Sequence, residues 1–287
     1  MRVLQSGPST LIEDLGRPGL AAQGVSPSGA MDRSALALAN RLLGNDDAAA
    51  GLEVLLGGLR LTAEGPLWIA VTGAWGDVTI DAARVEPHTA TPVEPGAVLS
   101  VGEATAGIRY YLAVRGGIAV EPVLGSRSRD VLAALGPSPL AAGDLLPVGS
   151  PPVRRIPPVD GVPVDPPTRG EIELALRPGP RRDWFAADAW RALSDTSWSV
   201  SARSDRTGVR LDGVALERVR SGELPSEGML RGAIQVSPDG APTVLGADHP
   251  VTGGYPVIAV VTDATVDRLA QARPGQPIRF THATGHA

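Results

Sequence analysis

Short apolar segments separated by Gly and Pro dominate the pattern along the chain. Most span three to seven residues, which is too short for helices and typical of strands joined by tight turns. They lie at Leu59–Leu61, Leu67–Val71, Val78–Ile80, Val98–Val101, Ile108–Val114, Leu145–Val148, Ile172–Leu176, Ser197–Ser201, Val209–Leu211, Gly232–Val236, Thr243–Leu245, Val257–Val261 and Ile278–Phe280. The pattern predicts a mainly β protein with a few short helices.

Four segments have helical spacing instead. In residues 28–45, apolar positions from Ala35 to Leu43 fall on one helical face, Asp32 can cap the start and Gly44 can end the helix. Three shorter helices are expected at residues 128–136, 183–194 and 263–275. The helices are therefore few, and both halves of the chain contain some.

A Pro-rich stretch divides the chain. Residues 150–170 have no periodic apolar pattern and predict an extended linker or interdomain strap. We therefore expect an N-terminal β-barrel domain at 1–149 and a C-terminal β-barrel domain at 171–287. A Pro-Gly turn leads into a closing strand at 95–102 and again at 274–281, which favours two similar barrels.

Composition excludes several kinds of chemistry. The chain has 35 Gly and 27 Pro but no Cys, so thiol nucleophiles, thiolate zinc sites and disulfides are excluded. Its 26 basic residues are all Arg, which excludes a P-loop lysine, a Schiff-base lysine and a biotinyl-lysine in this chain. The four His are scattered, and the spacing of His282 and His286 supplies no third ligand, so no metal site is expected.

Charge and hydropathy limit the partners. The net charge is −5 and no basic stretch is long, which argues against nucleic acid. No apolar run reaches the roughly 18–20 residues of a membrane helix, and the N-terminus lacks the features of a signal peptide. We expect a cytoplasmic protein with no membrane partner.

The polar residues suited to chemistry gather in Gly-rich loops. Residues 13–19 contain Asp14 and Arg17, and residues 125–130 place Arg127 and Ser128 at the start of a predicted helix, where an anion can bind. An ordinary helix cap beside a surface Arg is the alternative interpretation of this loop.

Two loops in the second half extend this set. In residues 204–211, Asp205 lies beside Arg206 and Arg210, and either a surface ion pair or a polarised carboxylate fits that pattern. Gln235 ends a predicted strand, and its amide can pair with a substrate amide or with neighbouring backbone. The loop Thr252, Gly253, Gly254 and Tyr255 lets a ligand approach the backbone closely, or simply turns.

Taken in order, these motifs resemble one family, the biotin-dependent carboxyltransferase-like or allophanate hydrolase subunit 2 group. The resemblance covers residues 5–281 and rests on EDLGRPG (13–19), SGAMDR (28–33), ANRLLGN (39–45), LEV (52–54), TGA (72–74), RYYLAVRGGI (109–118), GSRSRD (125–130), SDRTGVRL (204–211), GAIQV (232–236) and TGGYP (252–256). The family includes C subunits of bacterial 5-oxoprolinases, antagonists of a sporulation-kinase inhibitor, and part of the carboxyltransferase region of urea carboxylase. The first branch is the most similar.

The resemblance implies tandem cyclophilin-like barrels and a function that needs other chains. The expected activity is ATP-dependent opening of 5-oxo-L-proline to L-glutamate together with the A and B subunits, with this chain inactive alone, ATP bound by the complex, and no metal or biotin on this chain. The alternatives are a regulatory protein that binds a kinase inhibitor homologous to the B subunit, and a carboxyltransferase component of a urea carboxylase-type enzyme.

Both amide reactions need donors directed at a developing oxyanion. We expect Arg206 to polarise the amide oxygen, Asp205 to hold Arg206, and Gln235 to pair with the lactam edge. Arg127, Ser128 and residues 252–255 are the expected substrate-binding positions.

Overall fold

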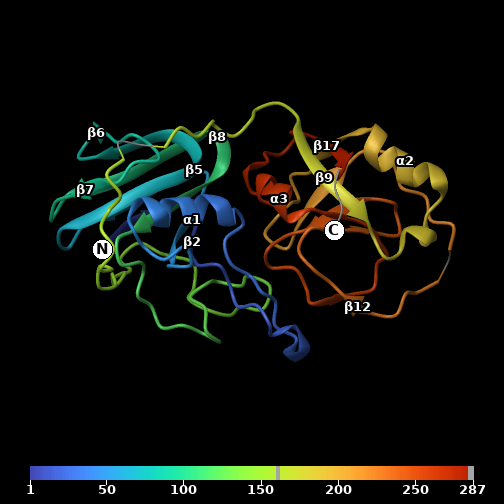
Figure 1. Cartoon of the computed structure of the whole chain (residues 1–287), viewed down its shortest axis with the longest axis horizontal. Coiled ribbons are helices and arrows are strands. Elements are labelled where there is room, and N and C mark those ends of the chain that lie inside the picture. The colour runs from blue at the N-terminus through green and yellow to red at the C-terminus, as the bar shows by residue number, and fades with distance from the viewer. Residues whose placement is uncertain (160–161, 221, 284–287) are drawn as a thin grey trace. The chain divides into compact units, whose positions relative to one another are not determined.

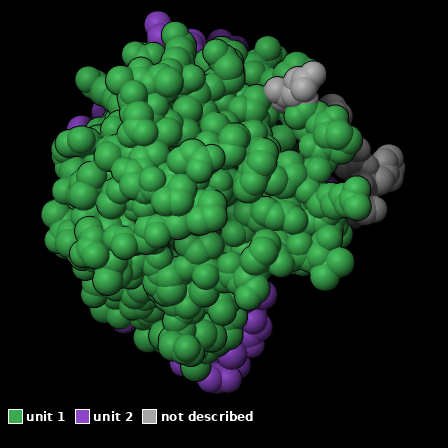
Figure 2. Space-filling view, turned by 90° about the vertical axis from the view of Figure 1, so that its left-hand side faces the viewer, with its two compact units in different colours: residues 1–17, 28–130, 134–167 green, residues 18–27, 131–133, 168–287 purple. Residues whose placement is uncertain are grey.

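The chain is built from two compact units. The computed structural model describes residues 1–159, 162–220 and 222–283 (Figure 1). The first unit comprises residues 1–17, 28–130 and 134–167, and the second comprises residues 18–27, 131–133 and 168–287 (Figure 2). Both units are mainly β, as expected. Whether residues 1–149 and 171–287 fold on their own as domains stays a prediction.

An eight-stranded sheet forms the first unit. Its path is β1-β4-β8-β3-β2, and β5 pairs with β6, β7 and β8. The strands are β1 (Arg2–Ser6), β2 (Ser9–Glu13), β3 (Gly51–Leu55), β4 (Leu59–Thr62), β5 (Leu67–Ile80), β6 (Ala83–Arg84), β7 (Thr91–Val93) and β8 (Val98–Val114). The long strands β5 and β8 pair antiparallel from Ile69–Val114 to Ile80–Leu99, and their inward side chains form the core together with those of β1 to β4.

A closed seven-stranded barrel forms the second unit, in the order β10-β11-β14-β13-β16-β9-β17. Its strands are β9 (Ile172–Pro178), β10 (Ser197–Val200), β11 (Gly208–Asp212), β13 (Ala233–Val236), β14 (Pro242–Leu245), β16 (Val257–Val261) and β17 (Pro277–His282). The pair β17–β9 is parallel and the other pairs are antiparallel. Trp198 and Phe280, each 1% exposed, fill the barrel core. Two short strands outside it, β12 (Glu227–Gly228) and β15 (Thr252–Gly253), pair with each other.

The predicted first helix is confirmed as α1 (Arg33–Leu42). The Asp32 carboxylate accepts a hydrogen bond from the Ala35 amide at 2.9 Å, and Gly44 turns the chain away with a φ of 67°. The helix packs against β5 and β8 within the first unit (Figure 1). The other helical segments are η1 (Ala21–Gln23), η2 (Arg182–Trp184), α2 (Ala187–Asp195), α3 (Asp263–Val266) and η3 (Asp267–Gln271).

The helix predicted at residues 128–136 is wrong. The Asp130 amide donates to the Leu135 carbonyl at 2.9 Å, so the segment closes as a turn, and Ala134 adopts a φ of 55°. The Ser128 hydroxyl donates to Asp14 at 2.6 Å instead of capping a helix. A contact between residues 114 positions apart therefore overrides the local helical spacing, and no helix start is available there for an anion.

The Pro-rich segment is held at both ends. Arg115 donates from Nη1 to the Leu43 carbonyl at 2.5 Å and from Nη2 to the Pro152 and Arg154 carbonyls at 3.1 and 2.7 Å. In the second unit, the Gln276 amide donates to the Thr168 and Gly170 carbonyls at 2.8 and 2.9 Å. The beginning of the segment thus packs on the first unit and its end packs on the barrel.

Candidate functional site

In the first unit, the Asp14 carboxylate organises the loop at 125–130. Asp14 is 7% exposed and accepts hydrogen bonds from the Ser126 and Ser128 hydroxyls, both at 2.6 Å. It also accepts from the backbone amides of Arg127 at 2.6 Å and Gly16 at 2.7 Å. Four donors on one buried carboxylate fix the two loops to each other.

The neighbouring side chains of Arg17 and Arg127 donate hydrogen bonds to backbone carbonyls. Arg17, 2% exposed, donates to the Ser128 carbonyl at 2.5 Å and to the Val123 carbonyl at 3.3 Å. Arg127 donates from Nε to the Val120 carbonyl at 2.7 Å. The structure therefore gives Arg127 and Ser128 contacts to Val120 and Asp14, which tie their loop to neighbouring segments of the first unit.

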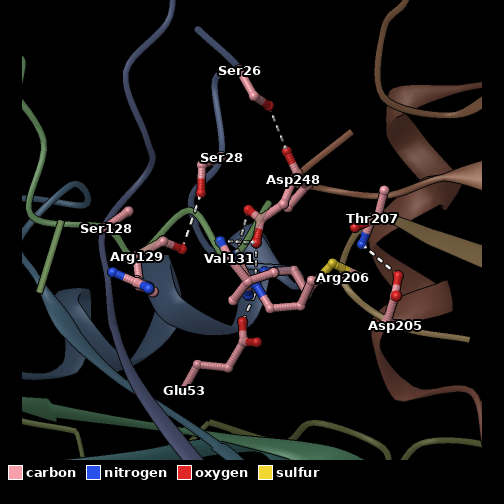
Figure 3. Close-up of polar contacts among 12 residues, drawn as sticks. Ser26, Ser28, Glu53, Ser128, Arg129, Val131, Asp205, Arg206, Thr207 and Asp248 are labelled. Atoms are coloured by element: carbon pink, nitrogen blue, oxygen red, sulfur yellow. Dashed lines mark hydrogen bonds and ion pairs between the residues drawn. The ribbon is translucent and has the colours of Figure 1, made fainter. Parts of the chain in front are cut away.

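In the second unit, Arg206 pairs with Asp248, whereas Asp205 was expected to be its partner. The Arg206 Nε lies 2.8 Å from Asp248 Oδ2 and its Nη2 lies 3.1 Å from Oδ1, and the Asp248 side chain is 0% exposed. Asp205 accepts from the backbone amides of Thr207 and Gly208 at 2.8 and 3.1 Å, which closes an exposed turn (Figure 3). The predicted Asp205–Arg206 pair is wrong, because the side chain of Asp205 turns back onto its own loop.

Two further segments of the second unit bond to the 247–248 turn, one through the Asp248 carboxylate and one through the Ala247 carbonyl. The Val131 amide donates to Asp248 Oδ2 at 3.0 Å, and the Ser26 hydroxyl donates to the Ala247 carbonyl at 3.3 Å (Figure 3). Arg206 is itself 7% exposed. This buried two-point pair ties Arg206 to the loop at 246–250.

The structure does bring Gln235 together with the loop at 252–255. Gln235 is 9% exposed, and its Nε2 donates to the Met229 sulfur and to the Tyr255 carbonyl, both at 3.3 Å. A Cβ on Gly253 would lie 2.6 Å from that nitrogen, so any residue other than glycine there would require the Gln235 side chain to shift. The Gln235 Oε1 accepts no hydrogen bond from the described residues and stays accessible to solvent.

Charged side chains contact the segments that flank this amide. Glu227 lies opposite Gly253 in the β12–β15 pair and forms a two-point ion pair with Arg181. The hydrogen bond from Arg181 lowers the pKa of the Glu227 carboxyl, so this carboxylate is ionised and neutralised. Arg218 lies 5.8 Å from the centre of the Tyr255 ring and donates to the Val236 carbonyl, and burial lowers the pKa of its guanidinium. We call Arg181, Arg218, Glu227, Gln235, Gly253 and Tyr255 the amide cluster.

The sequence therefore identified part of this arrangement. It singled out Gln235 and Thr252–Tyr255, which meet, and missed Arg181, Arg218, Glu227 and Asp248. Asp248 had one visible signal, an acidic residue in a Gly- and Pro-bounded turn directly before TGGYP. Arg181, Arg218 and Glu227 come from three separate segments, and no local pattern connects them.

Comparison with known proteins settles the family. The model of the family described as "Carboxyltransferase domain, subdomain A and B" matches residues 23–282. This chain is 37% identical to the C subunit of 5-oxoprolinase from Escherichia coli strain K12, over 99% of this chain and 91% of the other. The chain belongs to the carboxyltransferase domain, subdomain A and B, family. It is also 35% identical to the C subunit of Haemophilus influenzae 5-oxoprolinase and 34% identical to urea amidolyase of Saccharomyces cerevisiae, covering 86% and 16% of those proteins.

Solved structures of the family have the same fold. A crystal structure of TTHA0988 superposes with a TM-score of 0.88 at 37% identity, and one of Kluyveromyces lactis urea amidolyase does so with a TM-score of 0.92 at 31% identity. This chain is covered to 98% and 99% in these comparisons, and it spans 55% and 18% of the two crystallised chains. The barrel architecture expected from the resemblance is thus confirmed.

The described residues add two findings on other kinds of site. Among them, His, Asp and Glu form no group of three or more that could hold a metal ion, and His286 lies outside the described residues. No helix in the described part of the chain is long and apolar enough to cross a membrane.

Proposed function

We propose that this chain is the C subunit of an ATP-dependent 5-oxoprolinase. One observation carries the proposal: the chain is 37% identical to the C subunit of the E. coli 5-oxoprolinase over 91% of that protein. The reaction opens 5-oxo-L-proline to L-glutamate, with water adding across the lactam C–N bond while ATP is hydrolysed to ADP and phosphate. The A and B subunits complete the enzyme, and the complex acts in the cytoplasm.

We propose the amide cluster as the place where this chain meets the lactam. The free Oε1 of Gln235 is an acceptor for the lactam N–H, and its position is fixed because Nε2 is already bonded to Met229 and Tyr255. Thr252, Gly253 and Gly254 supply backbone to which a flat ring can lie close. A fixed acceptor orients the amide without reorganising during the reaction.

The remaining candidate residues act at a distance from the substrate in this proposal. Arg206 positions the loop at 246–250 through Asp248, and Asp205 closes its own turn. Arg127 and Ser128 shape the first-unit loop around Asp14. Donors for the lactam oxygen and the groups that hold ATP then come largely from the partner chains, in keeping with a chain that has no Lys.

Reconstitution tests the proposal. The purified chain alone should show no 5-oxoproline-dependent ATP hydrolysis, the A and B subunits without it should be inactive, and mixing all three should give glutamate and ADP in equal amounts. Turnover by the isolated chain would contradict the need for partners. Full activity of the A and B subunits without this chain would contradict its proposed role in the enzyme.

A second candidate function, carboxyl transfer from biotin to urea, is favoured by the family's description and by the urea amidolyase structure with its TM-score of 0.92. It predicts urea-dependent consumption of carboxybiotin when the chain is supplied with a partner chain and carboxylated biotin. A regulatory function instead predicts tight binding to a homologue of the B subunit with no turnover of either substrate.

A further inference from the structure

Arg218 is the cation of the amide cluster that forms no ion pair with the described residues, although the charge of Asp239 acts on it from a longer distance. Arg181, in the same cluster, is neutralised by Glu227. Arg218 forms no ion pair with any carboxylate in the described part of the chain, and its buried Nε has no hydrogen-bond partner there. Within the described residues, its one hydrogen bond runs from Nη2 to the Val236 carbonyl.

The backbone around Arg218 is held in place. Arg218 forms a β-bridge with Phe185, the Ala186 amide donates to the Glu217 carbonyl at 3.2 Å, and the Val219 amide donates to the Trp184 carbonyl at 2.9 Å. A side chain that projects from a fixed backbone and keeps donors unused is preorganised to accept an anion. The planar guanidinium suits a carboxylate, which it can bind at two points.

Tyr255 connects Arg218 to Gln235. Its ring lies under the Arg218 guanidinium, its carbonyl accepts from the Gln235 amide, and the residue is 49% exposed. A Cβ added to the adjacent Gly254 would have only the Leu224 carbonyl near it, at 3.5 Å. A Cβ added to Gly228 would have no atom within 4 Å. Tyr255 is thus in contact with both groups, with the Arg218 guanidinium through its ring and with the Gln235 amide through its carbonyl.

We infer that Arg218 binds the carboxylate of a cyclic amido acid whose N–H is accepted by Gln235. The inference rests on the proposed function and deepens it, because it assigns the acid group of the substrate to a particular side chain. The carboxylate of the ligand is then the direct ion-pair partner that Arg218 lacks among the described residues, whereas Arg181 already has Glu227.

Comparison of two ligands tests the inference. Calorimetry on the assembled complex without ATP gives the dissociation constants of 5-oxoproline and of 2-pyrrolidinone, the same lactam without its carboxylate. In the unmodified complex 5-oxoproline should bind more tightly. Arg218→Gln should lower this preference roughly 10- to 100-fold, the usual effect of removing a charge-assisted hydrogen bond. Arg218→Lys keeps the charge but loses the fork, and should lower the preference less.

Arg220→Gln is the matched control. Arg220 is two residues away, is half exposed, and already pairs with Asp183 at 2.8 Å, so its removal should leave the ligand preference unchanged. An unchanged preference in the Arg218 variants that assemble overturns the inference and leaves Arg218 as a structural donor to Val236. If the unmodified complex neither binds nor hydrolyses 5-oxoproline, the proposed function itself fails, and that result is visible without any variant.

Discussion

The buried pair of Arg206 and Asp248 should act mainly on stability. Their side chains are 8% and 0% exposed, and two contacts of 2.8 and 3.1 Å join them. Arg206→Met leaves a fully buried carboxylate without its guanidinium, which typically costs about 3–5 kcal/mol. At roughly 3–5 °C per kcal/mol for a unit of this size, the melting temperature should fall by about 10–20 °C.

A double-mutant cycle isolates the pair. Arg206→Met, Asp248→Asn and the double variant are compared by thermal and urea unfolding, and the double variant should be less destabilised than the sum by about 1–3 kcal/mol. Arg210→Met is the control, since Arg210 is exposed and its loss should change stability by only about 0.5 kcal/mol. Turnover per folded complex, measured well below the melting temperature, should stay within a few-fold of normal.

Two results would refute this reasoning. Additive effects within about 0.5 kcal/mol would mean that the two side chains are not coupled in the folded protein. A loss of turnover of a hundredfold or more with unchanged melting temperature would instead place Arg206 at the reacting atoms, as expected from the sequence alone.

Three further predictions follow from the described contacts. Gly253→Ala should push Gln235 aside and raise the KM for 5-oxoproline about tenfold, whereas Gly228→Ala on the paired strand, with open space around it, should not. Burial lowers the pKa of His88, so as pH falls through about 6.5 the unfolded chain takes up a proton that the folded chain does not. The free energy of unfolding should therefore decline toward pH 5, and His88→Asn should reduce this pH dependence. Trypsin should cut first within the predicted linker, at exposed Arg154, Arg155 or Arg169. The two fragments should each unfold cooperatively when followed by circular dichroism. Fragments that unfold on cleavage would refute the domain prediction.

The fold was predictable where its signals are local. The helix α1 has its cap at Asp32, its terminator at Gly44 and an apolar face between them, all within a few residues. Runs at 67–71 and 78–80 were recognisable as strands, but their merger into β5 was not, because bulges around Trp75 carry the pairing across a Gly-rich stretch. The short edge strands β1 and β2 were missed because each contains only two adjacent apolar residues, Val3-Leu4 and Leu11-Ile12.

The site was predictable only in part, because long-range partners decide the role of each polar residue. Ser128 was predicted as a helix cap, but its partner Asp14 lies 114 positions away. Arg206 was paired with its neighbour in sequence, whereas its partner Asp248 lies 42 positions away. Gln235 and Gly253 meet because strand β13 ends beside the loop that carries β15, and the sequence singled out both segments without a pattern that joins them.

The central claim, that this chain receives the lactam at Gln235, is tested most directly by the KM for 5-oxoproline of the reconstituted complex carrying Gln235→Met. Methionine keeps the length of the side chain and removes the amide oxygen. The account predicts normal assembly and a KM raised about tenfold, the effect of one lost hydrogen bond of about 1–1.5 kcal/mol. A complex that assembles normally and keeps the KM and kcat of the unmodified enzyme would contradict the claim.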